Sequence, residues 1–309
     1  MTPSELDARL SPALERRVDV WDLRLCVRDH GDADAPAIVL IMGLAAQLTE
    51  WPDEFIDHLV RGGHRVVRFD NRDIGLSDGF DHAGRLRPLF PELLKASFGL
   101  RVDAPYRLEH MAEDVVGLFD ALDIDEADVV GLSMGGMIGQ VLTARHPSRV
   151  KSFTALMTST NHPTLPKSKP KAMLALLGVG ADMRDEEGIV RHGVRTRRIL
   201  GGDAWPADAE LLEAHVRRTY ARSYRPRGVA RQLRAVMASG SLRKYSRAIR
   251  RPTLVLHGEA DPLVPVAAGR DIAKHVPGAR MRTFPGMGHT LPKELLPLLA
   301  AEILNHARR

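Results

Sequence analysis

The segment from residue 128 to residue 145 constrains the fold more than any other part of the chain. A short β-branched run, DVVGL, is followed by a helical stretch, and the two are joined by GLSMG at 131–135. Small residues on both sides of a serine let the backbone turn sharply from strand to helix, with the serine oxygen exposed above the sheet. Free N–H groups at the start of the helix favour negative charge at the same place. The pattern predicts a nucleophilic serine, Ser133, on a strand–helix turn.

Strand and helix patterns alternate through most of the chain. An antiparallel pair is predicted at 18–29, before the first buried strand. Short loops joining strands to helices are typical of a mostly parallel sheet, so the predicted fold class is α/β with helices flanking a central sheet. Buried-strand patterns occur at 37–42, 65–69, 128–132, 150–157, 252–257 and 280–284, and helical patterns at 51–60, 108–122, 134–145, 266–275 and 291–307.

Residues 161–250 interrupt this alternation. They contain Arg- and Ala-rich helical segments without a convincing strand, and they hold 19 Lys and Arg against 8 Asp and Glu, whereas the whole chain has a net charge of +5. This predicts a core domain of 1–160 and 251–309 and a helical cap of 161–250, inserted before the last strands. Because the rest of the chain carries a net negative charge, the basic segment indicates a distinct subdomain rather than a nucleic-acid binder. No nucleic-acid-binding motif accompanies it.

A serine needs a base that is itself oriented by an acid. Asp261 follows the strand at 252–257 in the loop GEADPLVP, and His289 follows the strand at 280–284 in PGMGH. Both positions fit the expected order of serine, acid and histidine along the chain. Glu259 is a competing acid, but Asp261 lies deeper in the loop and is the preferred candidate.

Two backbone N–H groups are expected to stabilise the oxyanion. One belongs to Met134, the residue after the nucleophile. The other is expected in the loop after the first buried strand, and Leu44 is the predicted donor.

Composition excludes several classes of protein. The single cysteine, Cys26, cannot form an internal disulfide, and there is no cysteine cluster for zinc. No nucleotide, calcium or zinc-protease motif occurs, so neither a cofactor nor a metal is expected. No apolar run is long enough to span a membrane, and the N-terminal region lacks the apolar run of a secretory signal. A soluble, cytoplasmic protein is expected, and a homodimer is possible because a pair of cap helices could serve a dimer as easily as a lid.

Several motifs occur together in the order found in one family: Met42-Gly43, WPDEF at 51–55, FDNRDIGLS at 69–77, the GLSMGG turn, HGEADPLVP at 257–265 and GMGH at 286–289. The chain resembles the α/β-hydrolase fold superfamily over nearly its whole length. The WPDEF and NRDIGLS segments are similar to the aclacinomycin methylesterase type, which demethylates a polyketide ester. The resemblance implies an α/β-hydrolase fold, a triad of Ser133, Asp261 and His289, and oxyanion donors at Leu44 and Met134. Residues 80–106 form a longer excursion than in that type, so substrate preference is not carried over.

The predicted function is a serine hydrolase that cleaves a small-molecule carboxylic ester through an acyl-enzyme. Cofactor-free perhydrolase or haloperoxidase-like activity, and hydrolysis of a lactone or a carbon–carbon bond, use the same residues and stay open. A ligand receptor on a hydrolase fold is the non-enzymatic alternative. Two hypotheses concern charge: Arg195, Arg197 or Arg198 attracts an anionic substrate, and Asp70, Arg72 and Asp73 form a salt-bridged brace.

Overall fold

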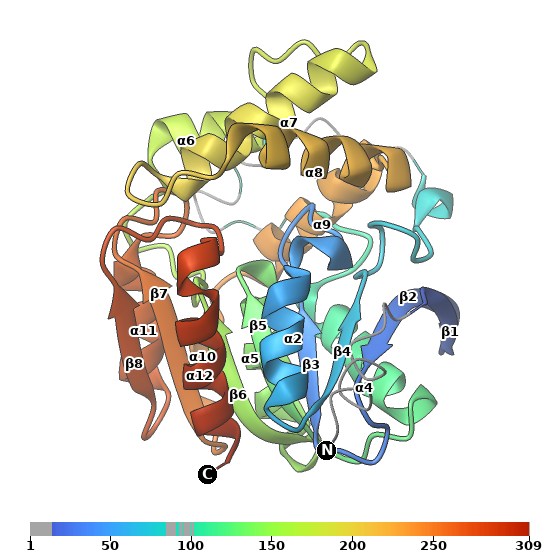
Figure 1. Ribbon diagram of the computed structural model, residues 1–309, viewed down its shortest axis with the longest axis vertical. Coiled ribbons are helices and arrows are strands. Elements are labelled where there is room, and N and C mark those ends of the chain that lie inside the picture. Colours follow the sequence, from blue (N-terminus) through green and yellow to red (C-terminus); the bar gives the residue numbers. More distant parts are fainter. Residues whose placement is uncertain (1–13, 85–90, 93–94, 96–99, 101, 309) are drawn as a thin grey trace.

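The computed structural model describes residues 14–84, 91–92, 95, 100 and 102–308. Eight strands form one twisted sheet in the order β1-β2-β4-β3-β5-β6-β7-β8 (Figure 1). The first two strands form an antiparallel pair, and β2 runs antiparallel to β4, whereas the other neighbours are parallel. The strands are β1 (Arg16–Val20), β2 (Leu23–His30), β3 (Ala37–Ile41), β4 (Arg65–Phe69), β5 (Ala127–Leu132), β6 (Val150–Leu156), β7 (Thr253–Gly258) and β8 (Arg280–Phe284).

Helices cover both faces of the sheet because the central strands are apolar on both sides. In β3, Ile38 and Leu40 belong to the hydrophobic cluster under α2 and α12, whereas Val39 and Ile41 belong to the cluster under α4, α5 and α11. The bounds of these helices are α2 (Asp53–Arg61), α4 (Leu108–Ala121), α5 (Met134–Arg145), α11 (Val266–His275) and α12 (Leu296–Ala307). Single turns of 3-10 helix lie at η1 (Leu48–Glu50), η2 (Asp81–Ala83), η3 (Pro147–Arg149) and η4 (Lys293–Leu295).

Five further helices form the helical cap inserted between β6 and β7. Figure 1 shows α6, α7 and α8 lying across the top of the sheet, with α9 beneath α8. The last of the five, α10, packs against α5 and α11 and so joins the helical layer of the core. The cap helices are α6 (Pro170–Leu176), α7 (Glu186–Gly201), α8 (Ala209–Arg222), α9 (Pro226–Ser239) and α10 (Arg243–Ala248).

The predicted fold class is confirmed: the sheet is mostly parallel, helices flank it, and a helical cap precedes the last two strands. The domain limits of 1–160 with 251–309, and 161–250, stay a prediction. The excursion at 80–106 falls partly outside the described residues. No helix in the described part of the chain is long and apolar enough to cross a membrane.

The predicted brace is also present, and it joins the core to the cap as well as to α4. The carboxylate of Asp70 pairs with Arg222 of α8, and that of Asp73 pairs with Arg231 of α9. The guanidinium of Arg72 pairs with Asp114 of α4. These side chains follow β4 and are buried, so they fix the cap above the carboxyl ends of the strands.

Candidate active site

The turn that carries Ser133 requires glycine on both sides. A Cβ on Gly131 would lie 2.4 Å from the carbonyl oxygen of Gly135, and one on Gly135 would lie 2.0 Å from that of Ile41. Ser133 itself has φ 55° and ψ −119°, a conformation that L-residues rarely adopt. Strain of this kind costs about 1–3 kcal/mol and persists only where the surrounding structure holds it.

Hydrogen bonds to β6 and the loop after it hold the strained serine. The Ser133 N–H donates to the carbonyl of Leu156 at 2.9 Å, and the Thr158 hydroxyl donates to the carbonyl of Ser133 at 2.6 Å. The side chain of Ser133 thereby projects beyond the sheet, where α5 begins. Because Met134 is the first residue of α5, its N–H has no partner within the helix.

Three predicted side chains meet above this turn. The Ser133 Oγ lies 3.0 Å from Nε2 of His289, and Nδ1 of His289 lies 2.6 Å from Oδ2 of Asp261. Asp261 is 4% exposed and His289 9% exposed, so this line of contacts is shielded from bulk water. The distances suit proton transfer from the serine hydroxyl to the imidazole, with the carboxylate fixing the imidazole tautomer.

The acid is held by its own loop. The N–H groups of Leu263 and Val264 donate to Oδ1 of Asp261 at 2.9 and 2.8 Å, which leaves Oδ2 for His289. Below it, the ring of His257 contacts the carbonyl of Val264, and burial lowers the pKa of this histidine. The competing acid, Glu259, is exposed and accepts a hydrogen bond from Thr283 instead.

The loop after β3 packs directly against the serine. A Cβ on Gly43 would lie 3.1 Å from the Cβ of Ser133, so only glycine fits at this distance without movement. The side-chain amide of Asn71 donates to the carbonyl of Met42 at 2.9 Å. Ala45 has a φ of 62°, and its N–H donates to Oε1 of Gln232 in α9 at 3.1 Å. Leu44 lies between these fixed points.

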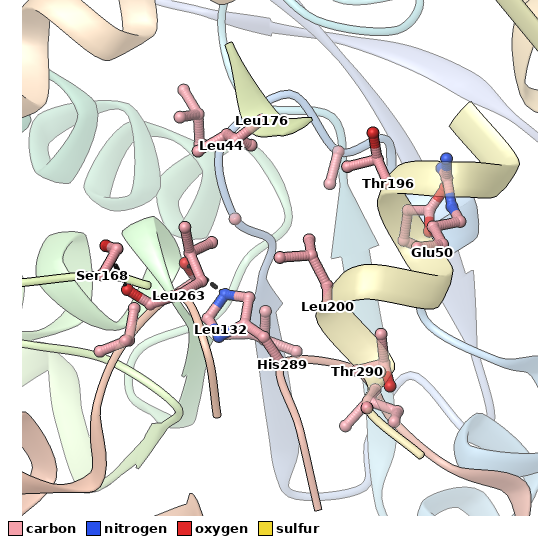
Figure 2. A pocket seen from close by; sticks show the side chains of 18 of the residues that line it. Leu44, Glu50, Leu132, Ser168, Leu176, Thr196, Leu200, Leu263, His289 and Thr290 are labelled. Carbon is pink, nitrogen blue, oxygen red and sulfur yellow. Dashed lines mark hydrogen bonds and ion pairs between the residues drawn. The ribbon is translucent and has the colours of Figure 1, made fainter. Parts of the chain in front are cut away.

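These residues gather where the strand order reverses, because β3 and β5 are neighbours but their chain connections run to opposite sides. Ligands of open α/β sheets bind at such switch points. A cavity of about 1320 Å³ lies here between the sheet edge and the cap, and Ser133 and His289 line it. Figure 2 shows His289 with leucine side chains around it. Apolar residues of the wall include Leu44, Leu132, Met137, Leu176, Leu200 and Trp205.

A buried charged cluster lies within this mostly apolar wall. Glu50 of the core accepts hydrogen bonds from Arg197 of α7, at 2.5 Å, and from His215 of α8, at 3.0 Å. Burial alone would raise the pKa of Glu50, but the two cap side chains outweigh it and lower the pKa to about 2. The charge of Arg197 is therefore paired with that of Glu50. Arg198 lines both the cavity and a separate groove on the cap, whereas Arg195 lines that groove and not the cavity.

No group of three or more histidine, cysteine or acidic side chains in the described ranges could hold a metal ion. The lone cysteine, Cys26, is buried under Arg222, and burial raises its pKa to about 12. It therefore stays a thiol rather than a nucleophilic thiolate.

The structure brings all five predicted site residues to one place: Ser133, Asp261 and His289 by direct contact, Met134 directly after the serine, and Leu44 next to Gly43, which packs against the serine. Sequence reasoning missed Thr158, Gln232 and the cluster around Glu50. No local pattern marks them, because their partners lie 25 to 187 residues away along the chain.

Comparison with known proteins agrees with this geometry. A family model described as the alpha/beta hydrolase fold matches residues 36–294. Rhodomycin D methylesterase DnrP of Streptomyces peucetius is 30% identical over 301 residues, covering 89% of this chain and 92% of the relative. 2-Hydroxymuconate semialdehyde hydrolase of Pseudomonas sp. strain CF600 is 28% identical, covering 90% of this chain and 88% of the relative.

Solved structures show the same fold at lower identity. The enol-lactonase from Burkholderia xenovorans LB400 superposes with a TM-score of 0.71 at 23% identity, covering 95% of this chain and all of the other. The expected resemblance to methylesterases is confirmed by the relatives at 30% identity. The chain is a hydrolase that belongs to the α/β-hydrolase fold family.

Proposed function

We propose that this hydrolase cleaves a carboxylic ester of a small molecule, with Ser133 as nucleophile, His289 as general base and acid, and Asp261 as the group that orients the imidazole. The observation that carries the proposal is the chain of contacts from Ser133 Oγ through His289 to Asp261, at 3.0 and 2.6 Å, beside a large apolar cavity.

In the first half-reaction Ser133 Oγ attacks the ester carbonyl carbon while its proton passes to Nε2 of His289. The carbonyl oxygen becomes an oxyanion, stabilised by the N–H groups of Leu44 and Met134; losing one such donor typically costs ~10²–10³ in turnover. The intermediate collapses, the C–O bond breaks, and His289 gives its proton to the departing alcohol. An acyl-enzyme remains on Ser133.

In the second half-reaction a water molecule takes the place of the alcohol. His289 accepts its proton as the water oxygen attacks the acyl carbon, and the same two N–H groups hold the second oxyanion. Collapse returns the proton to Ser133 and releases the carboxylic acid. In this mechanism the negative charge that develops on oxygen lies between the start of α5 and the turn after β3, and the positive charge develops on His289.

The relatives and the cavity support an ester of moderate size. A methylesterase is 30% identical over most of both chains. The mostly apolar wall suits an apolar acyl group, and the cluster of Glu50, Arg197 and His215 adds a polar contact on one side. In this proposal residues 161–250 act as the cap that covers the substrate.

A second candidate is hydrolysis of a carbon–carbon bond. It is favoured by the relative named as a 2-hydroxymuconate semialdehyde hydrolase, which is 28% identical over a similar share of the chain. The same residues would serve, but the leaving group is a carbanion that must be protonated on carbon. Hydrolysis of a lactone follows the same steps as hydrolysis of an open-chain ester, except that the carboxylic acid and the alcohol it produces remain parts of one molecule.

The proposal is tested by labelling with a fluorophosphonate probe and by turnover of p-nitrophenyl esters of increasing chain length, beside Ser133→Ala. We expect labelling and multiple turnover in the wild type, and loss of turnover by several orders of magnitude in a folded Ser133→Ala protein. Turnover retained by Ser133→Ala would exclude the assignment. Hydrolysis of 2-hydroxymuconate semialdehyde without ester hydrolysis would favour carbon–carbon cleavage, and stoichiometric capture without turnover would favour a receptor.

A further inference from the structure

Gln232 occupies a particular place between the cap and the core. It belongs to α9, the cap helix beneath α8, and its side chain is completely buried. Oε1 accepts the N–H of Ala45 in the loop after β3, at 3.1 Å, and Nε2 donates to the carbonyl of Arg72 in the loop after β4, at 2.8 Å. One cap side chain thus joins two active-site loops of the core.

The amide can bind these two partners in one orientation only. Ala45 offers a backbone donor and Arg72 a backbone acceptor, so the oxygen of the side chain must face Ala45 and the nitrogen must face Arg72. A flipped amide would set donor against donor and acceptor against acceptor. The hydrogen-bonding pattern therefore identifies Oε1 as the atom that holds the Ala45 N–H.

The group that Gln232 holds belongs to a tight turn. The Ala46 N–H donates to the carbonyl of Gly43 at 3.4 Å, and Ala45, the third residue of this turn, has a φ of 62°. A positive φ at the third position is the mark of a type II turn, which favours glycine there. Alanine favours type I, in which the Leu44–Ala45 peptide is rotated and its N–H points elsewhere. The contact with Gln232 opposes that rotation.

The turn also sets the direction of the predicted oxyanion donor. The carbonyl of Gly43 faces Ala46, so in a trans peptide the Leu44 N–H points to the opposite side of the same plane. Gly43 is packed against Ser133, and within the described ranges no acceptor binds the Leu44 N–H. The hydrogen bond that fixes the Gly43–Leu44 peptide in the turn is long, at 3.4 Å, so if the strain at Ala45 opens the turn, the Leu44 N–H loses this direction beside the nucleophile.

We propose that Gln232 is a positioning residue for the oxyanion hole: by accepting the Ala45 N–H it holds the turn at 43–46 in the form that directs the Leu44 N–H to the substrate carbonyl oxygen. The inference rests on the proposed function, because it concerns the oxyanion formed during attack by Ser133. In this proposal Gln232, a residue of the cap, contributes to stabilisation of the transition state.

The test replaces Gln232 with leucine, which fills similar space without the two hydrogen bonds. For one p-nitrophenyl ester we expect kcat to fall about tenfold with KM little changed, since a misdirected donor weakens the transition state and not the ground state. Affinity for a trifluoromethyl ketone analogue of the ester, whose adduct with the serine carries an oxyanion, is expected to fall by the same factor.

Gln47→Leu is the matched control. Gln47 is also buried and also links core to cap, since its Nε2 donates to the carbonyls of Thr219 and Ser223, but it does not bind the turn at 43–46. Gln47→Leu is expected to lower the melting temperature while kcat and inhibitor affinity stay near wild type. Equal losses of kcat in the two variants would show a general effect of loosening the cap and would overturn the inference.

A double-mutant cycle with Ala45→Gly separates positioning from packing. Glycine adopts the positive φ without a steric penalty, so the turn no longer depends on Gln232. Gln232→Leu should then reduce kcat less in the Ala45→Gly background than in the wild type. An equal reduction in both backgrounds, or an unchanged kcat in folded Gln232→Leu, would refute the inference.

Gln232→Asn, whose shorter amide cannot reach both loops, replaces the leucine variant in the same cycle if that protein does not fold. Absence of ester turnover in the wild type would instead refute the proposed function, before any variant is compared.

Discussion

The main-chain N–H of His289 donates a hydrogen bond of 2.7 Å to the carbonyl oxygen of Leu200, in the last turn of cap helix α7. The helix thus ends against the loop that carries the proposed base. The contact therefore fixes the backbone of His289 relative to the cap.

Gly288→Ala should disturb this contact. A Cβ at Gly288 would lie 2.3 Å from the carbonyl oxygen of Leu200 and 2.4 Å from that of Gly201, so either α7 or the histidine loop must move. We expect kcat/KM for a p-nitrophenyl ester to fall at least tenfold, because displacement of His289 lengthens its contact with Ser133. Steady-state kinetics beside a circular dichroism spectrum checks the result.

Gly201→Ala is the control on the opposite side of the same contact. Its added Cβ would contact the side chain of Thr290, with the hydroxyl at 3.2 Å and the methyl at 3.8 Å, and a small rotation of that side chain relieves the closer contact. Activity close to wild type in Gly201→Ala, together with a loss in Gly288→Ala, supports the argument. Full activity in Gly288→Ala would show that the loop adapts without moving the imidazole.

Sequence patterns were sufficient for the parts of the molecule that local physics determines. Sequence patterns predict the places of the glycine-flanked serine, the buried strands and the loops that carry Asp261 and His289. The serine turn accepts only small flanking residues, and the order of the strands determines which loops follow them. The contacts of Gln232, Glu50 and Leu200 could not be predicted in this way. They join the cap to the core, and their partners depend on how the cap helices pack, which no short pattern records.

Asp261→Asn tests the choice of acid. An asparagine cannot balance the imidazolium and can turn its amide NH₂ towards Nδ1 of His289, which favours the wrong tautomer; in a well-studied triad this change costs about 10⁴ in kcat. We expect a loss of about that size with KM much less affected, measured at saturating ester. The pH dependence of the residual activity should differ from that of the wild type.

Glu259→Gln is the matched change in the same loop. Glu259 is exposed and accepts a hydrogen bond from Thr283, so its neutral isostere should leave kcat within about twofold of the wild type. If instead Glu259→Gln were the inactive variant and Asp261→Asn the active one, the acid would have to be reassigned.

The lowered pKa of His30 predicts that the stability of the protein depends on pH. Burial, with the nearby Arg68 guanidinium, lowers the pKa of this histidine from 6.5 to about 4. Between these values the unfolded chain takes up a proton that the folded protein does not, so the free energy of unfolding falls as pH decreases from about 6.5 to about 4. The loss is complete once the folded protein also binds the proton.

His30→Gln should reduce this dependence, since glutamine keeps an acceptor for the Arg68 Nε–H, now at 3.3 Å from His30 Nε2, and does not titrate. Urea unfolding at pH 7.5 and pH 4.5 measures the effect, and the other buried histidines cancel when the two proteins are compared. Parallel losses of stability in both proteins would mean that His30 does not titrate as its burial indicates.

Arg231→Met should be among the most destabilising single changes in the cap. Arg231 is 3% exposed and donates to Asp73, which is completely buried and also accepts the Tyr106 hydroxyl at 2.6 Å. Removing the cation leaves a buried carboxylate without its counter-charge, which typically costs about 3–5 kcal/mol. Chemical denaturation should show this as a lower midpoint with little change in slope.

Two comparisons separate the buried charge from the loss of an arginine. Arg217→Met removes a cap arginine that hydrogen-bonds to Glu187 and Glu213 at the surface of the protein, and it should change the denaturation midpoint little. Adding Asp73→Asn to Arg231→Met should recover part of the lost stability, because the unpaired charge is then absent. If the double variant were less stable than Arg231→Met, the hydrogen bonds of Asp73, rather than its charge, would dominate this contact between core and cap.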